Sequence, residues 1–368
     1  MKPIMIFHPE GNLNVNPNLT GIVDILCEHG VRIHYYCHRK DGVPQSAWRE
    51  DITYIFLENG VLRLVDSYAL VIGVDRDGIL VASKVAQHLR VPYGLITYEI
   101  FFADETGVAY KQPEIEACSK IQFAICQGDA RSRELARENQ IPLGKIIDIP
   151  VAGRGIRRGN RNPVLHTALK LPPEMKIVLY IGSVISKWAM TEALIANTRD
   201  WDENWVLVLH NRYDDDQYRQ FRQYYSGMER VCFSPQSGLS FDEMQTLIHA
   251  ADLGVALYQP TFANQYEGKN LEFLGLSSGK ISSYLQHGIP VVVNDIGEMS
   301  KHVDDFQLGV HVRSLDELPA RLSATHRDAI GIWRENCFGF FEKYLDLNVR
   351  IAPLLDWIGR LRRDGGAP

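Results

Sequence analysis

The sequence of 368 residues lacks several features that mark common classes of protein. No apolar run approaches the about 20 residues that a membrane-spanning helix needs. The six cysteines lie far apart and form no C-x-x-C pair, so neither a zinc site nor a redox motif is indicated. The net charge of −6 gives no general attraction to nucleic acid or anionic lipid. These absences favour a cytoplasmic protein with reduced core thiols.

Two nucleotide-binding fingerprints are missing as well. The loop in FHPEGNLNVNPNLTGIV (7–23) lacks G-x-G-x-x-G, which argues against a dehydrogenase. The segment GLSSGKI (275–281) has one residue too few between its glycines for an ATP-binding P-loop, and an isoleucine replaces the metal-binding hydroxyl. The chain begins MKPIMIFHPEG, which we expect to form a strand rather than a signal peptide.

The acidic run YDDDQY (213–218) is a candidate metal site by composition alone. Its acids precede a helical pattern, however. Acids at the start of a helix cap free amides and oppose the helix dipole. We therefore expect a capped helix here and no metal.

Short apolar runs alternate with amphipathic helical patterns along most of the chain. Strand-like runs occupy residues 4–7, 32–37, 69–73, 92–98, 122–126 and 146–150, and then 176–182, 205–210, 230–234, 252–258, 289–294 and 308–312. Strands buried on both faces and joined by helices form parallel sheets. The Gly- and Arg-rich segment 151–172 between the two series is interpreted as a linker. The sequence thus predicts an α/β protein with two doubly wound, Rossmann-like domains, which bind ligands beyond the carboxyl ends of their strands.

A lysine stands in an unfavourable place in SSGKISSYLQHGIPVVVND (277–295), which is predicted to form a short helix and then a buried strand. Lys280 falls in the first turn, where the helix dipole opposes a cation by about 0.3–1 kcal/mol. The free amides of a helix start form an anion site, so a phosphate between them and Lys280 would compensate the cation. The alternative is a solvated lysine paired with Glu272 or Glu267.

The segment GKISSYLQHGIPVVVND resembles the K-l-x-E-Y-l-a-x-G-x-P-V-v segment of retaining GT-B glycosyltransferases, especially bacterial family 4-like enzymes. LIHAADLGVALYQP (247–260) and IVLYIGSVISKWAMTEALI (177–195) resemble other parts of their nucleotide-sugar domain, and SRELARENQIPLGKIIDIPVAG (132–153) resembles the end of their acceptor domain. The resemblance spans both domains and is sharpest in the second. It implies the GT-B fold, in which an acceptor-binding domain (1–155) and a nucleotide-sugar-binding domain (156–335) face a cleft, and a helical tail (336–368) packs back on the first domain.

This resemblance implies a retaining, metal-independent hexosyltransferase of polysaccharide biosynthesis that needs no bound cofactor. The donor would be a nucleotide diphospho-sugar of UDP or GDP type, and the acceptor a glycan, a lipid-linked saccharide or a small molecule. Such an enzyme would act in the cytoplasm, with peripheral contact at the inner face of the membrane as an open alternative. Two other functions stay open: a degenerate GT-B protein that serves as a non-catalytic binding or scaffold subunit, and a nucleotide-sugar epimerase or hydrolase.

The resemblance also implies site residues in the second domain. Lys280, Lys187 and Glu272 are the expected catalytic residues, because the two lysines would hold the diphosphate and Glu272 would face the sugar. The expected donor-binding residues are Gly182, Ser183, Asn211, Tyr258, Gly279, Ser282 and Ser283. The chain departs from the family pattern at Ser283, where a ribose-binding glutamate is expected, and at Gly275, where an earlier glutamate is expected. A hydroxyl cannot offer the bidentate hydrogen bonds of a carboxylate.

The first domain offers candidates for the acceptor side of the cleft. They are Gly11 and Asn12 after the first strand, and Asp75, Tyr98 and Glu99 at the ends of later strands. An acid at this edge would orient an acceptor hydroxyl. The apolar run IFF (100–102) either meets a lipid carrier or packs inside. The linker arginines Arg154, Arg157 and Arg158 either touch donor phosphates, favour an anionic membrane surface or are solvated.

Overall fold

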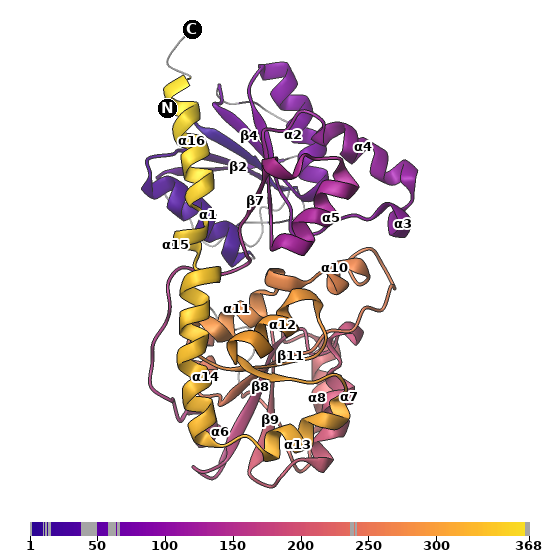
Figure 1. Cartoon of the computed structure of the whole chain (residues 1–368), viewed down its shortest axis with the longest axis vertical. Coiled ribbons are helices and arrows are strands. Elements are labelled where there is room, and N and C mark those ends of the chain that lie inside the picture. Colours follow the sequence, from indigo (N-terminus) through magenta and orange to yellow (C-terminus); the bar gives the residue numbers. More distant parts are fainter. Residues whose placement is uncertain are drawn as a thin grey trace. The chain divides into compact units, whose positions relative to one another are not determined.

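The computed structural model describes residues 2–9, 11, 13, 16–37, 50–57, 64, 67–235, 239 and 241–364 (Figure 1). The contacts between residues divide the chain into two compact units. Unit 1 comprises Met1–Arg154, Asn264–Tyr266 and Leu345–Pro368, and unit 2 comprises Gly155–Ala263 and Glu267–Tyr344. The prediction of two doubly wound parallel-sheet domains is confirmed.

Unit 1 is built on a parallel sheet of seven strands with the order β3-β2-β1-β4-β5-β6-β7. The strands are β1 (Ile4–Phe7), β2 (Ile33–Cys37), β3 (Ile52–Phe56), β4 (Leu70–Val74), β5 (Tyr93–Ile96), β6 (Phe123–Cys126) and β7 (Ile146–Asp148). Sequence analysis did not predict β3. It is an edge strand, ITYIF, in which Thr53 is exposed and the three residues after it are partly buried, whereas central parallel strands are buried throughout.

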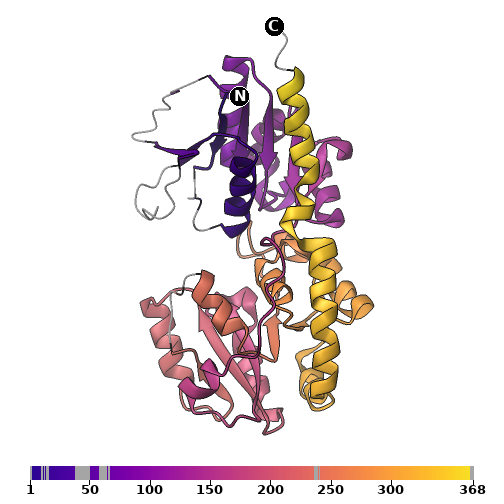
Figure 2. The ribbon, with the colours of Figure 1, turned by 90° about the vertical axis from the view of Figure 1, so that its left-hand side faces the viewer.

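Helices cover both faces of this sheet, as the two views in Figure 1 and Figure 2 show. They are α1 (Pro17–Glu28), α2 (Asp75–Leu89), α3 (Ala103–Thr106), α4 (Val108–Cys118), α5 (Asp129–Asn139), α15 (Leu347–Arg350) and α16 (Ala352–Asp364). The start of α1 follows its sequence, because Asn16 accepts a hydrogen bond from the amide of Leu19 and Pro17 occupies the first position. The last two helices join the same core as β1, through side chains such as Leu347 and Leu354.

Unit 2 contains a parallel sheet of six strands with the order β10-β9-β8-β11-β12-β13. The strands are β8 (Lys176–Gly182), β9 (Trp205–Asn211), β10 (Val231–Phe233), β11 (Leu253–Ala256), β12 (Val291–Val293) and β13 (Gly309–His311). The helices are α6 (Val164–Leu169), α7 (Thr191–Asn197), α8 (Asp216–Tyr225), α9 (Phe241–Ile248), α10 (Lys269–Glu272), α11 (Gly279–Gln286), α12 (Gly297–Phe306), α13 (Leu318–Ser323) and α14 (Arg327–Phe340). A turn of π-helix, Phe341–Leu345, follows α14.

The acidic run before α8 acts as a helix cap. Asp215 is the N-cap and accepts a hydrogen bond of 2.8 Å from the amide of Tyr218, while Asp216 pairs with Arg219. In the described ranges, no group of three His, Cys, Asp or Glu side chains is placed so that it could hold a metal ion. Among the described helices, none combines the length and the apolar character that crossing a membrane requires.

Candidate functional site

Each sheet has one point where the strand order reverses, and these points define the candidate sites. The reversal lies between β1 and β4 in unit 1 and between β8 and β11 in unit 2. Loops leave such neighbouring strands toward opposite faces of the sheet, which opens a crevice at the carboxyl ends where ligands bind. In unit 2 the segments that follow these ends begin at Ser183 and Leu257. The helix α11 brings Lys280 to the same place.

The ammonium of Lys280 lies among three aromatic rings, which we call the aromatic cage: Tyr180, Trp188 and Tyr258. Its Nζ is 3.8 Å from the ring centroid of Tyr180, 5.2 Å from that of Tyr258 and 5.9 Å from that of Trp188. This Nζ is buried and has no hydrogen-bond partner among the described residues. Burial lowers the pKa of Lys280 to about 7, because removal from water penalises the charged form. The side chain is therefore a buried donor that lacks an acceptor.

The proposed ion pair between Lys280 and a nearby glutamate is not found. Glu272 is exposed at the end of α10, and no salt bridge joins it to Lys280 within the described residues. Glu267 instead accepts a hydrogen bond of 2.6 Å from the hydroxyl of Thr261. The interpretation of Lys280 as a solvated, carboxylate-paired lysine is wrong, because its stem passes into the interior rather than along the surface.

Hydrogen bonds hold the first turn of α11 against the sheet. Ser278 is the N-cap and accepts from the amide of Ile281 at 3.2 Å, and its Oγ also lies 2.7 Å from the hydroxyl of Tyr258. The hydroxyl of Tyr284 donates to the carbonyl of Leu179 at 2.7 Å and accepts from the amide of Ile181 at 3.0 Å, so it ties α11 to β8. These contacts fix the direction in which Lys280 points.

Two glycines belong to this arrangement, and only one of them makes room for a side chain. A Cβ at Gly254 would lie 2.4 Å from the ring of Tyr284, so a side chain on β11 would displace the tyrosine. Gly182, with φ of +115°, ends β8, and a Cβ there would lie 3.4 Å from Cε of Lys280. A contact at that distance is ordinary, so it is the positive φ of Gly182, rather than the space beside Lys280, that favours glycine at this position.

The predicted donor-binding residues around β8 and β9 have structural partners. Asn211 is buried, accepts from the amide of Val184 at 3.0 Å and donates to the carbonyl of Tyr213 at 2.7 Å. It therefore holds the loop that contains Gly182 and Ser183 in place. Ser183 is half-buried in that loop. Asn211 positions the loop, and the direct contact with a donor stays a prediction for all three residues.

The serines of α11 bond to their own helix. The hydroxyls of Ser282 and Ser283 both donate to the carbonyl of Gly279, at 3.1 and 2.7 Å. Such bonds to a carbonyl in the preceding turn are a common use of serine within a helix. Ser283, which stands where a ribose-binding glutamate was expected, has its donor engaged, and its role toward a ribose stays a prediction.

Lys187 and Glu272 are exposed, and among the described residues neither forms a hydrogen bond or an ion pair with Lys280. Lys187 is exposed at the start of a 3-10 turn, Lys187–Ala189, and its ammonium makes no hydrogen bond or ion pair with the described residues. Its neighbour Trp188 points inward and stacks on Tyr258, with ring centroids 5.6 Å apart and planes 1° from parallel. The catalytic roles of Lys187 and Glu272 stay predictions.

Sequence analysis missed three residues of this site. Tyr180 and Trp188 form two walls of the aromatic cage, and Asn294 joins the ends of β11 and β12. The side chain of Asn294 accepts from the amide of Tyr258 at 2.9 Å and donates to its carbonyl at 2.8 Å. Tyr180 lies within an apolar run that predicted only a strand. Asn294 had a detectable signal, because a polar residue directly follows the buried run IPVVV.

In unit 1 the structure brings together three of the predicted acceptor residues at the reversal point. Asp75 begins α2 with φ of +53°, and its Oδ1 accepts from the amides of Tyr98 at 2.6 Å and Glu99 at 3.1 Å. The carboxylate of Glu99 lies 3.8 Å from the guanidinium of Arg131. Burial raises the pKa of Glu99 to about 7, although Arg131 opposes the shift. Its side chain is 39% exposed, so water moderates this shift.

Gly11 lies against a buried histidine at the end of β1. A Cβ at Gly11 would lie 2.2 Å from Cε1 of His8, whose Nδ1 is 2.5 Å from the hydroxyl of Tyr35. Burial lowers the pKa of His8 to about 4. Asn12 lies outside the described residues. The glycine packs on His8, and its contact with an acceptor stays a prediction.

The linker arginines and the apolar run IFF have partners within the protein. Arg154 binds both carboxylate oxygens of Glu28 at 2.6 and 2.8 Å, and Arg158 binds Glu335 at 3.0 Å. Arg157 donates to Gln245 at 3.1 Å. The run 100–102 is buried, with at most 5% exposure, so it packs inside rather than facing a lipid.

The two doubly wound units define the class of fold: the chain has the GT-B fold, as predicted. Residues 199–344 match the family of glucosyltransferase 3-like proteins, C-terminal domain. Comparison with curated proteins finds no match.

Solved structures match along almost the whole chain. HepE from Anabaena in complex with UDP-glucose is 14% identical with a TM-score of 0.74, over 98% of this chain and 100% of that one. Sucrose-phosphate synthase from Thermosynechococcus elongatus is 13% identical with a TM-score of 0.72, over 99% and 100%. α,α-Trehalose 6-phosphate synthase from Burkholderia multivorans is 12% identical with a TM-score of 0.67, over 100% and 99%.

Proposed function

We propose that this protein is a glycosyltransferase whose unit 2 binds a nucleotide diphospho-sugar, and that Lys280 receives the diphosphate. The observation that carries the proposal is the buried Nζ of Lys280, which lacks a hydrogen-bond partner among the described residues at the β8–β11 reversal point. A buried donor without an acceptor is unfavourable unless a ligand supplies one. The match to a glucosyltransferase family over residues 199–344 and the UDP-glucose bound to HepE support a UDP-sugar as donor.

The chemistry follows from the charge on the leaving group. When the bond between the sugar and the diphosphate breaks, negative charge grows on the phosphate oxygens and must be stabilised. The ammonium of Lys280 and the amides at the start of α11 would supply this stabilisation without a metal ion. Because burial lowers the pKa of Lys280 to about 7, the arriving diphosphate would also restore the charge on the amine.

The acceptor side and the stereochemistry are further parts of the proposal. Glu99 of unit 1, whose amide Asp75 holds in place, would orient the hydroxyl of a glycan, a lipid-linked saccharide or a small molecule, and the transfer would retain the anomeric configuration. The NMR coupling constant of the new anomeric proton distinguishes retention from inversion. Activity that is unchanged by EDTA would support the absence of a metal requirement, and its loss on chelation would contradict it.

Donor binding is tested by thermal shift with UDP, UDP-glucose, GDP and GDP-mannose. A stabilising shift with UDP or UDP-glucose supports the proposal, since a ligand that binds only the folded state raises its stability. The shift should disappear in Lys280→Met and persist in Lys301→Met, a matched change of an exposed lysine on α12 of the same unit. No shift with any of the four nucleotides would refute the proposal.

A non-catalytic GT-B subunit is the second candidate, and Ser283 is the observation that favours it. A ribose-binding carboxylate is replaced by a hydroxyl that already donates to Gly279. This candidate predicts a nucleotide-induced thermal shift without turnover of UDP-glucose in the presence or absence of acceptors. Release of UDP without an acceptor would instead indicate a hydrolase, and a changed sugar without transfer would indicate an epimerase.

A further inference from the structure

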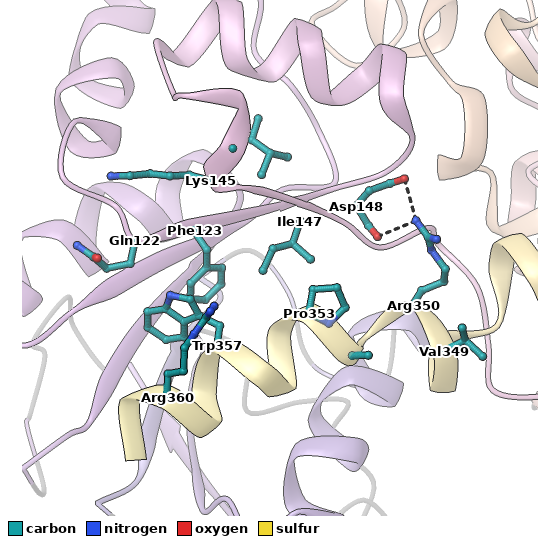
Figure 3. A pocket seen from close by; sticks show the side chains of 13 residues that line it. Gln122, Phe123, Lys145, Ile147, Asp148, Val349, Arg350, Pro353, Trp357 and Arg360 are labelled. Atoms are coloured by element: carbon teal, nitrogen blue, oxygen red, sulfur yellow. Dashed lines mark hydrogen bonds and ion pairs between the residues drawn. The ribbon is translucent and has the colours of Figure 1, made fainter. Parts of the chain in front are cut away.

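A pocket of about 550 Å³ lies along the edge strand β7 of unit 1, away from the β1–β4 reversal point. Two segments far apart in the sequence line it, one at residues 122–148 and one at residues 349–360. Figure 3 shows Trp357 and Arg360 at one end and Asp148 with Arg350 at the other, with Ile147 and Pro353 between them. Its volume falls within the about 300–1,000 Å³ of small-molecule sites.

One end of the pocket offers a fixed aromatic surface. The ring of Trp357 packs on Phe123 with centroids 4.8 Å apart, and the indole is partly buried against the core of unit 1. Such support holds the indole in place while leaving part of it open to the pocket. An aromatic face of this kind accepts the apolar C–H face of a sugar ring, because both surfaces lose contact with water.

The other end offers a pair of planar polar groups. The guanidinium of Arg350 lies 3.2 Å from the carboxylate of Asp148, and the amide of Gly128 donates to the same carboxylate. The two planar groups present donors and acceptors side by side, which suits the neighbouring hydroxyls of a saccharide. Since both side chains of the pair are 32% exposed, water or a ligand can reach them.

The pocket carries more basic than acidic side chains, unlike the chain as a whole. Lys145, Arg350 and Arg360 line it together with one acid, Asp148, whereas the chain has a net charge of −6. Arg360 is exposed, and its guanidinium makes no hydrogen bond or ion pair with the described residues. Lys145 donates to the carbonyl of Ile121 at 2.7 Å, so its ammonium is held at the rim. The local excess of positive charge selects a negatively charged ligand.

We propose that this pocket binds an anionic saccharide, with a sugar ring on Trp357, hydroxyls on the Asp148–Arg350 pair, and a carboxylate or phosphate near Arg360 and Lys145. This site is separate from the donor site of unit 2 and does not depend on transfer activity. An acidic peptide is the competing occupant, because β7 is an edge strand with unpaired backbone groups. The aromatic face and the planar pair favour the saccharide.

The test is isothermal titration calorimetry of the full chain with tetragalacturonate, maltotetraose and tetraglutamate. Tetragalacturonate should bind more tightly than neutral maltotetraose, and the affinity should fall as salt rises. Arg360→Glu should weaken tetragalacturonate binding by about fivefold or more, because an attraction becomes a repulsion. Arg363→Glu is the matched control on the same helix, because it changes the charge equally outside the pocket, and it should change the affinity by less than about twofold.

A second variant tests the aromatic surface. Trp357→Ala should abolish the preference for saccharides, and its melting curve shows whether unit 1 stays folded. If Trp357→Ala unfolds, Arg360→Glu alone tests the proposal, because Arg360 is exposed and its substitution should leave unit 1 folded. Tighter binding of tetraglutamate than of tetragalacturonate, no binding of tetragalacturonate, or equal losses in Arg360→Glu and Arg363→Glu would each overturn the proposal. The UDP-induced thermal shift should persist in Arg360→Glu, which separates this result from a failure at the donor site.

Discussion

The two reversal points share a topology but hold their charged groups in opposite ways. In unit 1 the carboxylate of Asp75 accepts from the amides of Tyr98 and Glu99 and so has protein partners. In unit 2 the ammonium of Lys280 faces aromatic rings and lacks a hydrogen-bond partner among the described residues. A satisfied buried group mainly stabilises the fold, whereas an unsatisfied one costs stability until a ligand arrives. Asp75 thus supports the backbone of unit 1, whereas Lys280 of unit 2 is the group that we propose captures a ligand.

The largest effect is expected at Lys280. Lys280→Met keeps the length and packing of the stem but removes the charge, so transfer from UDP-glucose should fall by about 10³-fold in kcat/KM, or ~4 kcal/mol. The free energy of unfolding should stay equal or rise, because the variant no longer buries an amine without an acceptor. Steady-state kinetics and urea unfolding measure the two quantities. If Lys280→Met lost stability but kept its activity, Lys280 would stabilise the fold rather than bind the donor, and the contrast with Asp75 would not hold.

Acid should destabilise both units through buried histidines, and the largest contributions should come from His8 in unit 1 and His287 in unit 2. Burial lowers the pKa of His8 and of His287 from 6.5 to about 4, and His249, Arg157 and Arg334 lie near His287 and lower its pKa further. The unfolded chain therefore binds more protons below pH 6.5, so stability is complete above that pH and is lost as the pH falls toward 4. Each histidine accounts for up to about 3 kcal/mol of this loss.

Substituting His8 and His287 separately tests how much each unit contributes to the acid sensitivity. His8→Asn and His287→Asn retain a donor near the position of Nδ1 but cannot become charged, and each should flatten the dependence of the unfolding free energy on pH between 6.5 and 4. His88→Asn, at an exposed position of α2, is the matched control and should leave the dependence as it is. If neither buried variant changes the slope, the acid sensitivity arises elsewhere.

A moderate effect is expected at Asp75, and it should fall on stability. Asp75→Ala leaves the amides of Tyr98 and Glu99 without their acceptor, which should lower the free energy of unfolding by about 1–3 kcal/mol. Asp75→Asn keeps an acceptor oxygen and should recover most of this loss. Thermal and urea unfolding measure the change. UDP binding to unit 2 should be the same in both variants, and a loss of UDP binding would show that the two reversal points are not independent.

The architecture could be predicted from the sequence because buried parallel strands leave continuous apolar runs. The run IVLYI predicted β8. The edge strand β3 was missed because its burial is incomplete. Lys280 could be singled out because a cation in the first turn of a helix conflicts with the dipole. The aromatic cage could not, since Tyr180 and Trp188 reach Lys280 only through the packing of β8 and the loop after it. Residues that meet through tertiary contacts leave no periodic signal.

The last effect that sharpens the contrast, and the smallest per pH unit, is the dependence of donor binding on pH. The pKa of Lys280 is about 7 without a ligand, and a bound diphosphate favours the charged form and raises it. Binding therefore takes up a proton above pH 7, and the affinity for UDP should fall as the pH rises from about 7 to 9, by up to about tenfold per pH unit. Calorimetry in two buffers of different ionisation enthalpy measures the proton uptake directly. Lys280→Arg should bind UDP without this dependence, because its guanidinium stays charged throughout the range. Equal proton uptake by Lys280→Arg would show that another group titrates on binding. The aromatic cage would then only pack against Lys280 and would not hold the group whose charge changes.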